Sequence, residues 1–140
     1  MTELTKTNST KPAIVVSDVD YKRLSDLAAG ALDRFPAVAE ELLAEMDRAQ
    51  VVSASLIPPG VAQMHSTIAY RADSGQERRV TLVYPGEADI AANRISILTP
   101  IGTALIGLSK DQSITWVTRD GQRHALTVLS VEQPSSILAD

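Results

Sequence analysis

The chain of 140 residues contains no cysteine, and this absence removes several kinds of chemistry at once. Disulfide bonds, thiol nucleophiles and thiolate-held metals are excluded, and the lack of thiols fits a reducing compartment. Long apolar runs are also missing, because the longest one, residues 101–108, is too short to span a bilayer. Residues 1–13 lack the apolar segment of a signal peptide. We therefore expect a soluble cytoplasmic protein without a membrane partner.

Aromatic residues are scarce, with one Phe, one Trp and three Tyr. The core must be mostly aliphatic, and an aromatic-lined pocket for a flat ligand or for stacked bases is hard to assemble. The net charge of −4 lies entirely in residues 18–50, which carry eight acidic and four basic side chains. Because phosphate binding requires basic surface, we expect no direct binding to nucleic acid. An acidic segment suits a basic protein groove better.

Residues 14–52 predict an antiparallel helical hairpin. Ser17 is a suitable N-cap, and Asp18 and Asp20 are favourable in the first helical turn. Two apolar stripes of helical period follow, separated near Pro36, which can begin a helix but not lie inside one. The stripes comprise Tyr21, Leu24, Leu27, Ala28, Ala31 and Leu32, and then Val38, Ala39, Leu42, Leu43, Met46 and Ala49. Packed together, they leave the acids outside, and each arm reaches ~22 Å.

The rest of the chain predicts an α+β arrangement with a second domain at residues 61–133. Serines, prolines and a glycine in residues 53–60 predict a linker. Alternating residues then predict one strand hairpin over 61–71 and 77–84, and another over 113–118 and 123–131, which turns at Asp120-Gly121. With the strand at 94–98, these make an antiparallel sheet around one short helix. Polar residues at 1–13 and 134–140 predict disordered tails.

The strand at 94–98 is predicted to run directly into the short helix. Thr99 is a suitable N-cap, Pro100 occupies the first helical position, and Gly107 stands where the helix should end. A strand that leads into a capped helix without a flexible loop makes a rigid corner.

The same segment imitates a nucleotide-binding P-loop, because four residues separate Gly102 from Gly107. A P-loop needs lysine after its second glycine, and Leu108 stands there instead. The helix also begins before Gly102, which places this glycine inside the helix rather than in a phosphate-binding loop. We therefore predict no nucleotide site and no cofactor.

Three sequence pieces resemble the regulator of nucleoside diphosphate kinase family, within the Gre transcription-factor superfamily. They are Glu-Leu-Leu-Ala-Glu-Met-Asp-Arg-Ala at 41–49, Thr-Leu-Val-Tyr-Pro at 81–85, and Ile-Ser-Ile-Leu-Thr-Pro-Ile-Gly-Thr-Ala-Leu-Ile-Gly-Leu at 95–108. With Asp111 and Trp116, the resemblance covers residues 14–133. It implies an N-terminal antiparallel coiled coil and a C-terminal domain of FKBP-like fold.

The resemblance also implies RNA polymerase as the partner, with the C-terminal domain on the rim of the secondary channel and the coiled coil pointing inward. The implied contact is the corner at Thr99 and Pro100, preceded by Leu98 where cleavage factors often carry a polar or acidic residue. Glu87 and Asp89 match the acidic loop before the corner strand.

Cleavage-stimulating relatives hold a catalytic magnesium with two acids three residues apart at the coiled-coil tip, since paired carboxylates suit a hydrated divalent ion. Here Asp33 is followed three residues later by Pro36, and the ~22 Å arm is shorter than in cleavage factors. We therefore predict a monomeric, non-enzymatic regulator without cleavage activity or a metal. Asp33, Glu40 and Glu41 are the candidate channel-facing acids.

Other readings remain open at this stage. The family name implies an effect on nucleoside diphosphate kinase levels, and the alternative function is an interaction module with a partner other than polymerase, such as that kinase. An FKBP-like fold suggests prolyl isomerase activity, but Tyr70, Tyr84 and Trp116 are too few to line such a site. The two histidines, His65 and His124, lie in no zinc-ligand pattern.

Overall fold

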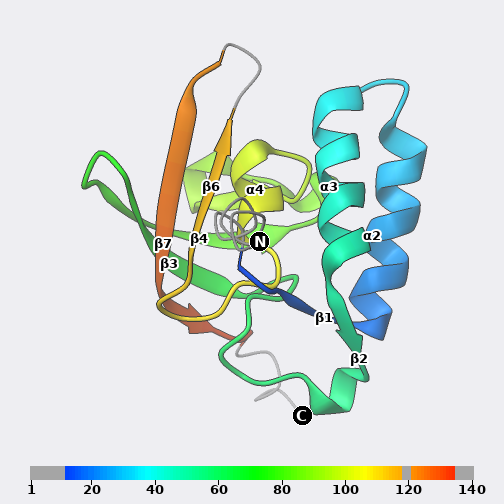
Figure 1. Cartoon of the computed structure of the whole chain (residues 1–140), viewed down its shortest axis with the longest axis horizontal. Helices are drawn as coiled ribbons and strands as arrows, with labels where there is room; N and C mark the ends of the chain where they lie inside the picture. The colour runs from blue at the N-terminus through cyan, green and yellow to red at the C-terminus, as the bar shows by residue number, and fades with distance from the viewer. Residues whose placement is uncertain (1–11, 118–120, 135–140) are drawn as a thin grey trace, which may run out of the picture.

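A helical hairpin lies beside a five-stranded sheet in the computed structural model, which describes residues 12–117 and 121–134. Figure 1 shows a short helix, α4, between the sheet and the hairpin. The two predicted tails fall outside the described residues except at 12, 13 and 134, as does Asp120 of the predicted turn. The α+β arrangement with an N-terminal helix pair is confirmed.

The hairpin consists of α2 (Asp18–Ala31) and α3 (Pro36–Arg48). The hydroxyl of Ser17 accepts a hydrogen bond from the N–H of Asp20 at 3.0 Å, so the predicted N-cap is confirmed. Pro36 begins α3, as predicted, because its fixed φ suits the first helical turn and its missing N–H costs nothing there.

Of the twelve predicted apolar stripe positions, six are buried and four are partly buried, and three residues require a correction. Tyr21 and Leu32, the first and last positions of the first stripe, are 38% and 37% exposed. Glu45 does not face outward with the other acids: it is 4% exposed, and its Oε1 accepts hydrogen bonds from Arg48, with 2.9 Å to Nη2. The ion pair compensates the burial of this carboxylate.

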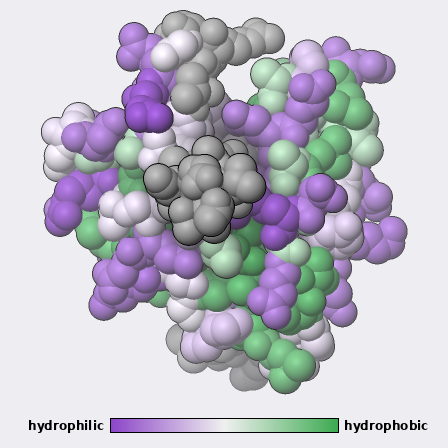
Figure 2. Space-filling model, viewed as in Figure 1, coloured by the Kyte–Doolittle hydropathy of each residue, from purple (hydrophilic) through white to green (hydrophobic). Residues whose placement is uncertain are grey.

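A small parallel sheet closes the base of the hairpin. Its strands are β1 (Val15–Ser17) and β2 (Gln50–Val52). The N–H of Val15 donates to the carbonyl of Gly107 at 3.2 Å, which ties β1 to the segment after α4. The predicted linker contains a 3-10 turn at Ala54–Leu56. Figure 2 shows apolar side chains at this lower end of the molecule, where Leu56 is 73% exposed.

The larger sheet has the strand order β5-β4-β3-β7-β6. Its strands are β3 (Thr67–Ala72), β4 (Glu77–Val83), β5 (Arg94–Ser96), β6 (Ser113–Val117) and β7 (Arg123–Glu132). Both predicted hairpins are present, with β3 against β4 and β6 against β7. Strand β7 also pairs with β3 and so joins the two hairpins into one sheet.

Two details of the sheet differ from the sequence prediction. The first strand begins at Thr67 rather than at Val61, because Ser66 donates its N–H to Gln63 in a turn and His65 has a φ of 73°. The sheet is also mixed, since β5 runs parallel to β4. The connection through 3-10 turns at Pro85–Glu87 and Ile90–Ala92 is longer than a hairpin turn. It carries the chain back along β4, so that β5 lies parallel to Thr81–Val83 at the end of β4.

One aliphatic core joins the hairpin, α4 (Pro100–Leu105) and the sheet. Leu42 of α3, Leu82 of β4 and Leu105 of α4 are each 0% exposed and belong to the same buried cluster. Each such side chain contributes about 1.5–3 kcal/mol through burial. The two predicted domains therefore share buried contacts, and the division at residues 53–60 stays a prediction.

Candidate functional site

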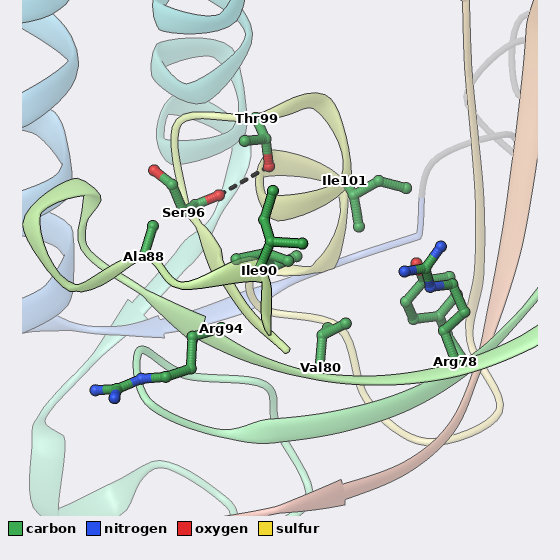
Figure 3. A pocket seen from close by; sticks show the side chains of 10 residues that line it. Arg78, Val80, Ala88, Ile90, Arg94, Ser96, Thr99 and Ile101 are labelled. Carbon is green, nitrogen blue, oxygen red and sulfur yellow. Dashed lines mark hydrogen bonds between the residues drawn. The ribbon is translucent and has the colours of Figure 1, made fainter. Parts of the chain in front are cut away.

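The predicted corner between β5 and α4 is built from short-range hydrogen bonds. The Thr99 hydroxyl donates to the carbonyl of Ser96 at 2.8 Å, drawn as the dashed line in Figure 3, and accepts from the N–H of Gly102 at 3.0 Å. Thr103 donates its hydroxyl to the carbonyl of Pro100 at 3.0 Å. Pro100 is the first residue of α4 and is exposed. The cap and the first-turn proline are as predicted.

Close backbone contact at Gly102 fixes the angle of the corner. A Cβ on this residue would lie 2.4 Å from the carbonyl oxygen of Ser96 and 2.9 Å from the Cα of Ile97. Gly102 lies within α4, as the sequence indicated, and it lets this helix pack directly against the strand end that precedes it. The orientation of α4, and with it that of the exposed Pro100 at its first position, is therefore set by the close packing of Gly102 against the backbone of Ser96 and Ile97.

The end of α4 uses a second glycine. Gly107 has a φ of 82°, and its N–H donates to the carbonyl of Ala62 at 2.8 Å. A Cβ there would lie 2.7 Å from the Cβ of Ile14, at the entry to the hairpin. Gly107 thus stops the helix and brings β1 close to it, which links the corner to the hairpin.

The two predicted docking acids have structural roles in the loop before β5. Glu87 is hydrogen-bonded to His65, with 2.8 Å between Oε1 and Nε2, and it accepts the N–H of Tyr84 at 3.3 Å. The hydrogen bond from His65 is the main cause that lowers the pKa of Glu87. Asp89 caps the next turn by accepting the N–H of Ala91 at 3.1 Å. Both acids are exposed.

Asp20 joins α2 to the loop that carries His65, a role that the sequence analysis did not predict. Its Oδ2 accepts the N–H of Met64 at 3.3 Å. Burial is the main cause that raises the pKa of Asp20, opposed by this hydrogen bond and by the charges of His65 and Arg23. Burial and the Asp20 charge also raise the pKa of Tyr84, whose ring stands edge-on to His65.

The predicted acids of the hairpin do not lie together. Asp33 is exposed in the connection after α2, and Glu40 is exposed on α3. Glu41 is partly buried and lines a cavity of about 20 Å³ with Pro100 and Trp116. Glu41 therefore faces α4 and β6 rather than open solvent. Their role as channel-facing acids stays a prediction.

Leu98 lies where the corner meets the hairpin. With Pro85 it lines a hollow of about 400 Å³, and Leu27, Ala31 and Phe35 line the side formed by the hairpin. Phe35 is 51% exposed at the tip, beneath the guanidinium of Arg34 at 5.9 Å from the ring centre. Leu98 is thus partly buried against the helices, whereas Pro100 is free to contact a partner.

The histidines and Trp116 also have defined surroundings. His65 lies in a loop instead of the predicted strand, whereas His124 is in β7 and stacks on Trp116 with ring centres 5.5 Å apart. Trp116 is half-buried on β6, as predicted. Within residues 12–117 and 121–134, no three metal-ligating side chains form a cluster. No helix in these ranges is long and apolar enough to cross a membrane.

Comparison with known proteins identifies the family. A family model described as the Rnk N-terminus matches residues 12–52, and one described as the C-terminal part of transcription elongation factors GreA and GreB matches residues 57–133. The chain is 36% identical over 128 residues to the regulator of nucleoside diphosphate kinase of Escherichia coli strain K12, across 90% of this chain and 94% of that protein. The chain belongs to the regulator of nucleoside diphosphate kinase family. The resemblance seen in the sequence is confirmed.

Transcription elongation factors are also among the similar proteins. Transcription elongation factor GreA of Azorhizobium caulinodans is 36% identical over 84 residues, which are 59% of this chain and 54% of that factor. A solved structure of a GreA/GreB elongation factor from Nitrosomonas europaea superimposes with a TM-score of 0.68 at 38% identity, covering 87% of this chain and 99% of that one. The corner at Thr99 and Pro100 lies inside the GreA/GreB match.

Proposed function

We propose that this protein is a non-enzymatic transcription regulator that binds RNA polymerase near its secondary channel. The observation that carries the proposal is the GreA/GreB family match over residues 57–133, which contains the whole corner. In this proposal the β domain is FKBP-like, the hairpin is a short coiled coil, and the protein acts in the cytoplasm as a monomer. It affects nucleoside diphosphate kinase levels through transcription and binds no nucleic acid directly.

The corner is the proposed contact with polymerase. Pro100 is exposed on a turn that Thr99 and Gly102 hold in place, so binding requires little ordering of this segment. Glu87 and Asp89 add negative charge in the exposed loop before β5. Leu98 connects the contact to the hairpin through the hollow next to α2. A partner that contacts both the corner and the loop before β5 would meet an apolar edge and two carboxylates.

The hairpin is proposed to enter the channel without supporting transcript cleavage. Helix α2 has 14 residues, which span about 21 Å. In the tip at residues 32–35, Asp33 is the only carboxylate, and a lone carboxylate is a poor ligand set for a hydrated magnesium ion. The expected result on backtracked polymerase complexes is no stimulation of RNA cleavage. Efficient cleavage would contradict this part of the proposal.

The corner is tested by variants that keep the fold. Thr99→Asp retains an N-capping side chain but adds a charge, and Pro100→Ala removes the exposed ring. Pro58→Ala, at another exposed proline, is the matched control. We expect weaker capture of core polymerase by the two corner variants and unchanged capture by the control. Unchanged capture by both corner variants would remove the corner from the contact.

An interaction with nucleoside diphosphate kinase itself is the second candidate, and the name of the Escherichia coli relative favours it. Immobilised protein can be incubated separately with purified core polymerase and with purified kinase. The main proposal predicts retention of polymerase alone. Retention of the kinase without polymerase would favour the second candidate.

A further inference from the structure

An apolar pocket of about 350 Å³ lies beside the corner, between the sheet and α4. Two of the residues that line it, Tyr70 of β3 and Val80 of β4, are buried. Figure 3 shows Val80 on the sheet and Ile101 on α4 across the pocket from it. Ile90, on the 3-10 turn before β5, is 84% exposed at its rim. The volume falls in the range of ligand pockets, and the exposed isoleucine extends the apolar surface beyond the pocket itself.

Arg78 gives this apolar pocket a positive end. Its neighbour on β4, Arg79, forms an ion pair with Glu132 at 2.5 Å, and Arg71 pairs with Glu77 at 3.1 Å. Among the described residues, Arg78 has no ion-pair partner. Arg94 also lines the pocket, but Figure 3 shows its guanidinium directed away from Arg78. An anionic group in the pocket would therefore meet Arg78.

The pocket adjoins a free stretch of sheet edge. Strand β5 pairs with Thr81–Val83 alone, so within the described chain no strand covers Glu77–Val80 on the side away from β3. The N–H of Thr81 donates toward the β5 side, to Asn93 at 2.8 Å. Because backbone groups of alternate residues point the same way along an antiparallel strand, the N–H and carbonyl of Arg79 face this open side.

We propose that an extended segment of a partner protein pairs with β4 at Arg79, placing an aliphatic side chain in the pocket and an acidic side chain on Arg78. Strand addition gains affinity from main-chain hydrogen bonds and specificity from pockets that take alternate side chains. Arg78 and Val80 are two residues apart on one face, so the acid and the aliphatic residue are separated by one position in the bound segment. The open edge and the exposed Ile90 favour a peptide over a small free carboxylate. This site does not require polymerase binding by the corner.

The probe is a fluorescein-labelled peptide, acetyl-Asp-Thr-Leu-Thr-Ile-Thr-amide, titrated against the full chain and followed by fluorescence anisotropy. We expect saturable binding, and about tenfold weaker binding to Arg78→Ala, since the substitution removes a hydrogen bond between two charged groups. A peptide with lysine in place of aspartate should bind weakly for the same reason. Ile90→Ala should reduce affinity several-fold.

Two variants at one position test the main-chain pairing. Arg79→Ala and Arg79→Pro both lose the ion pair with Glu132, but only the proline variant lacks the N–H on the open edge. We expect Arg79→Ala to bind the peptide within about twofold of the wild type, and Arg79→Pro to bind several-fold more weakly. If Arg79→Pro does not fold, slowed hydrogen exchange of the Arg79 amide on peptide binding replaces it.

Several results would overturn the proposal. The first is the absence of saturable binding at millimolar peptide. Arg78 would then serve only to prevent the exposed edge of β4 from pairing with a strand of another molecule. Equal binding by Arg78→Ala would exclude the charge contact. Octanoate is the probe for a small-molecule site: if it competes at the pocket while Arg79→Pro and Arg79→Ala bind the peptide equally, the pocket takes a free carboxylate and no added strand.

Discussion

Replacement of Gly102 by alanine tests whether the corner is held by close backbone packing. Alanine is normally favoured over glycine inside a helix by about 1 kcal/mol. Here the added Cβ would lie 2.4 Å from the carbonyl oxygen of Ser96 and 2.9 Å from the Cα of Ile97, neither of which belongs to a flexible side chain. Overpacking costs about 1–3 kcal/mol, and rigid neighbours favour the upper end. The net expectation is a destabilisation of about 2 kcal/mol, or roughly 8 °C in melting temperature.

Gly30→Ala is the matched control, because Gly30 also lies in a helix and is exposed. A Cβ there would meet no described residue within 4 Å. We expect this variant to gain about 0.5–1 kcal/mol, the opposite sign to Gly102→Ala. Urea unfolding followed by far-UV circular dichroism measures both free energies. If Gly102→Ala is as stable as the wild type or more so, α4 does not pack closely on the strand end, and backbone packing does not make the corner rigid.

Three further predictions concern the cap and the shifted carboxyl groups. Thr99→Ala should lower the free energy of unfolding by about 1 kcal/mol, whereas Thr99→Ser, which keeps the capping hydroxyl, should lose much less; urea unfolding compares them. The pKa of Asp20 is higher in the folded chain than its ordinary 3.8, so the folded chain favours the protonated carboxyl group. The stability that this protonated group contributes is fully present below pH 3.8 and is lost as the pH rises through the folded pKa. The melting temperature of Asp20→Asn, compared with that of the wild type, should therefore increase from acidic to neutral pH. A decrease in this difference would refute the prediction. The lowered pKa of Glu87 implies a contribution present above its ordinary 4.5 and lost on acidification through the folded pKa, and His65→Asn, which tolerates the positive φ, should raise that pKa in a carboxyl NMR titration.

Local sequence signals predicted the caps and the corner because each depends on residues close together in the chain. Ser17 bonds to Asp20, and Thr99 bonds to Gly102, both over three positions. Pro36 marks a helix start by its own fixed φ. These features follow from side-chain chemistry and backbone restriction, so they need no knowledge of the tertiary fold.

The features that the sequence did not predict depend on distant contacts. Asp20 and Met64 are 44 positions apart, and the position of Asp20 in a first helical turn gave no sign that it would bind a loop. Likewise, Glu87 meets His65 from 22 positions away. The parallel pairing of β5 could not be predicted from alternation, which is the same for parallel and antiparallel neighbours when strands are short. The pocket beside Arg78 could not be predicted either, because its prediction requires the register of the strands in the sheet.

Binding to polymerase through the corner is tested most directly by equilibrium binding of the full chain to purified RNA polymerase core enzyme. The labelled wild-type chain, Pro100→Ala and Pro58→Ala are titrated in parallel at one fixed salt concentration. We expect saturable binding of the wild type and of Pro58→Ala, with Pro100→Ala about tenfold weaker, as for the loss of a well-packed apolar contact of about 1.4 kcal/mol. Absence of saturable binding by the wild type would contradict the proposed binding to RNA polymerase.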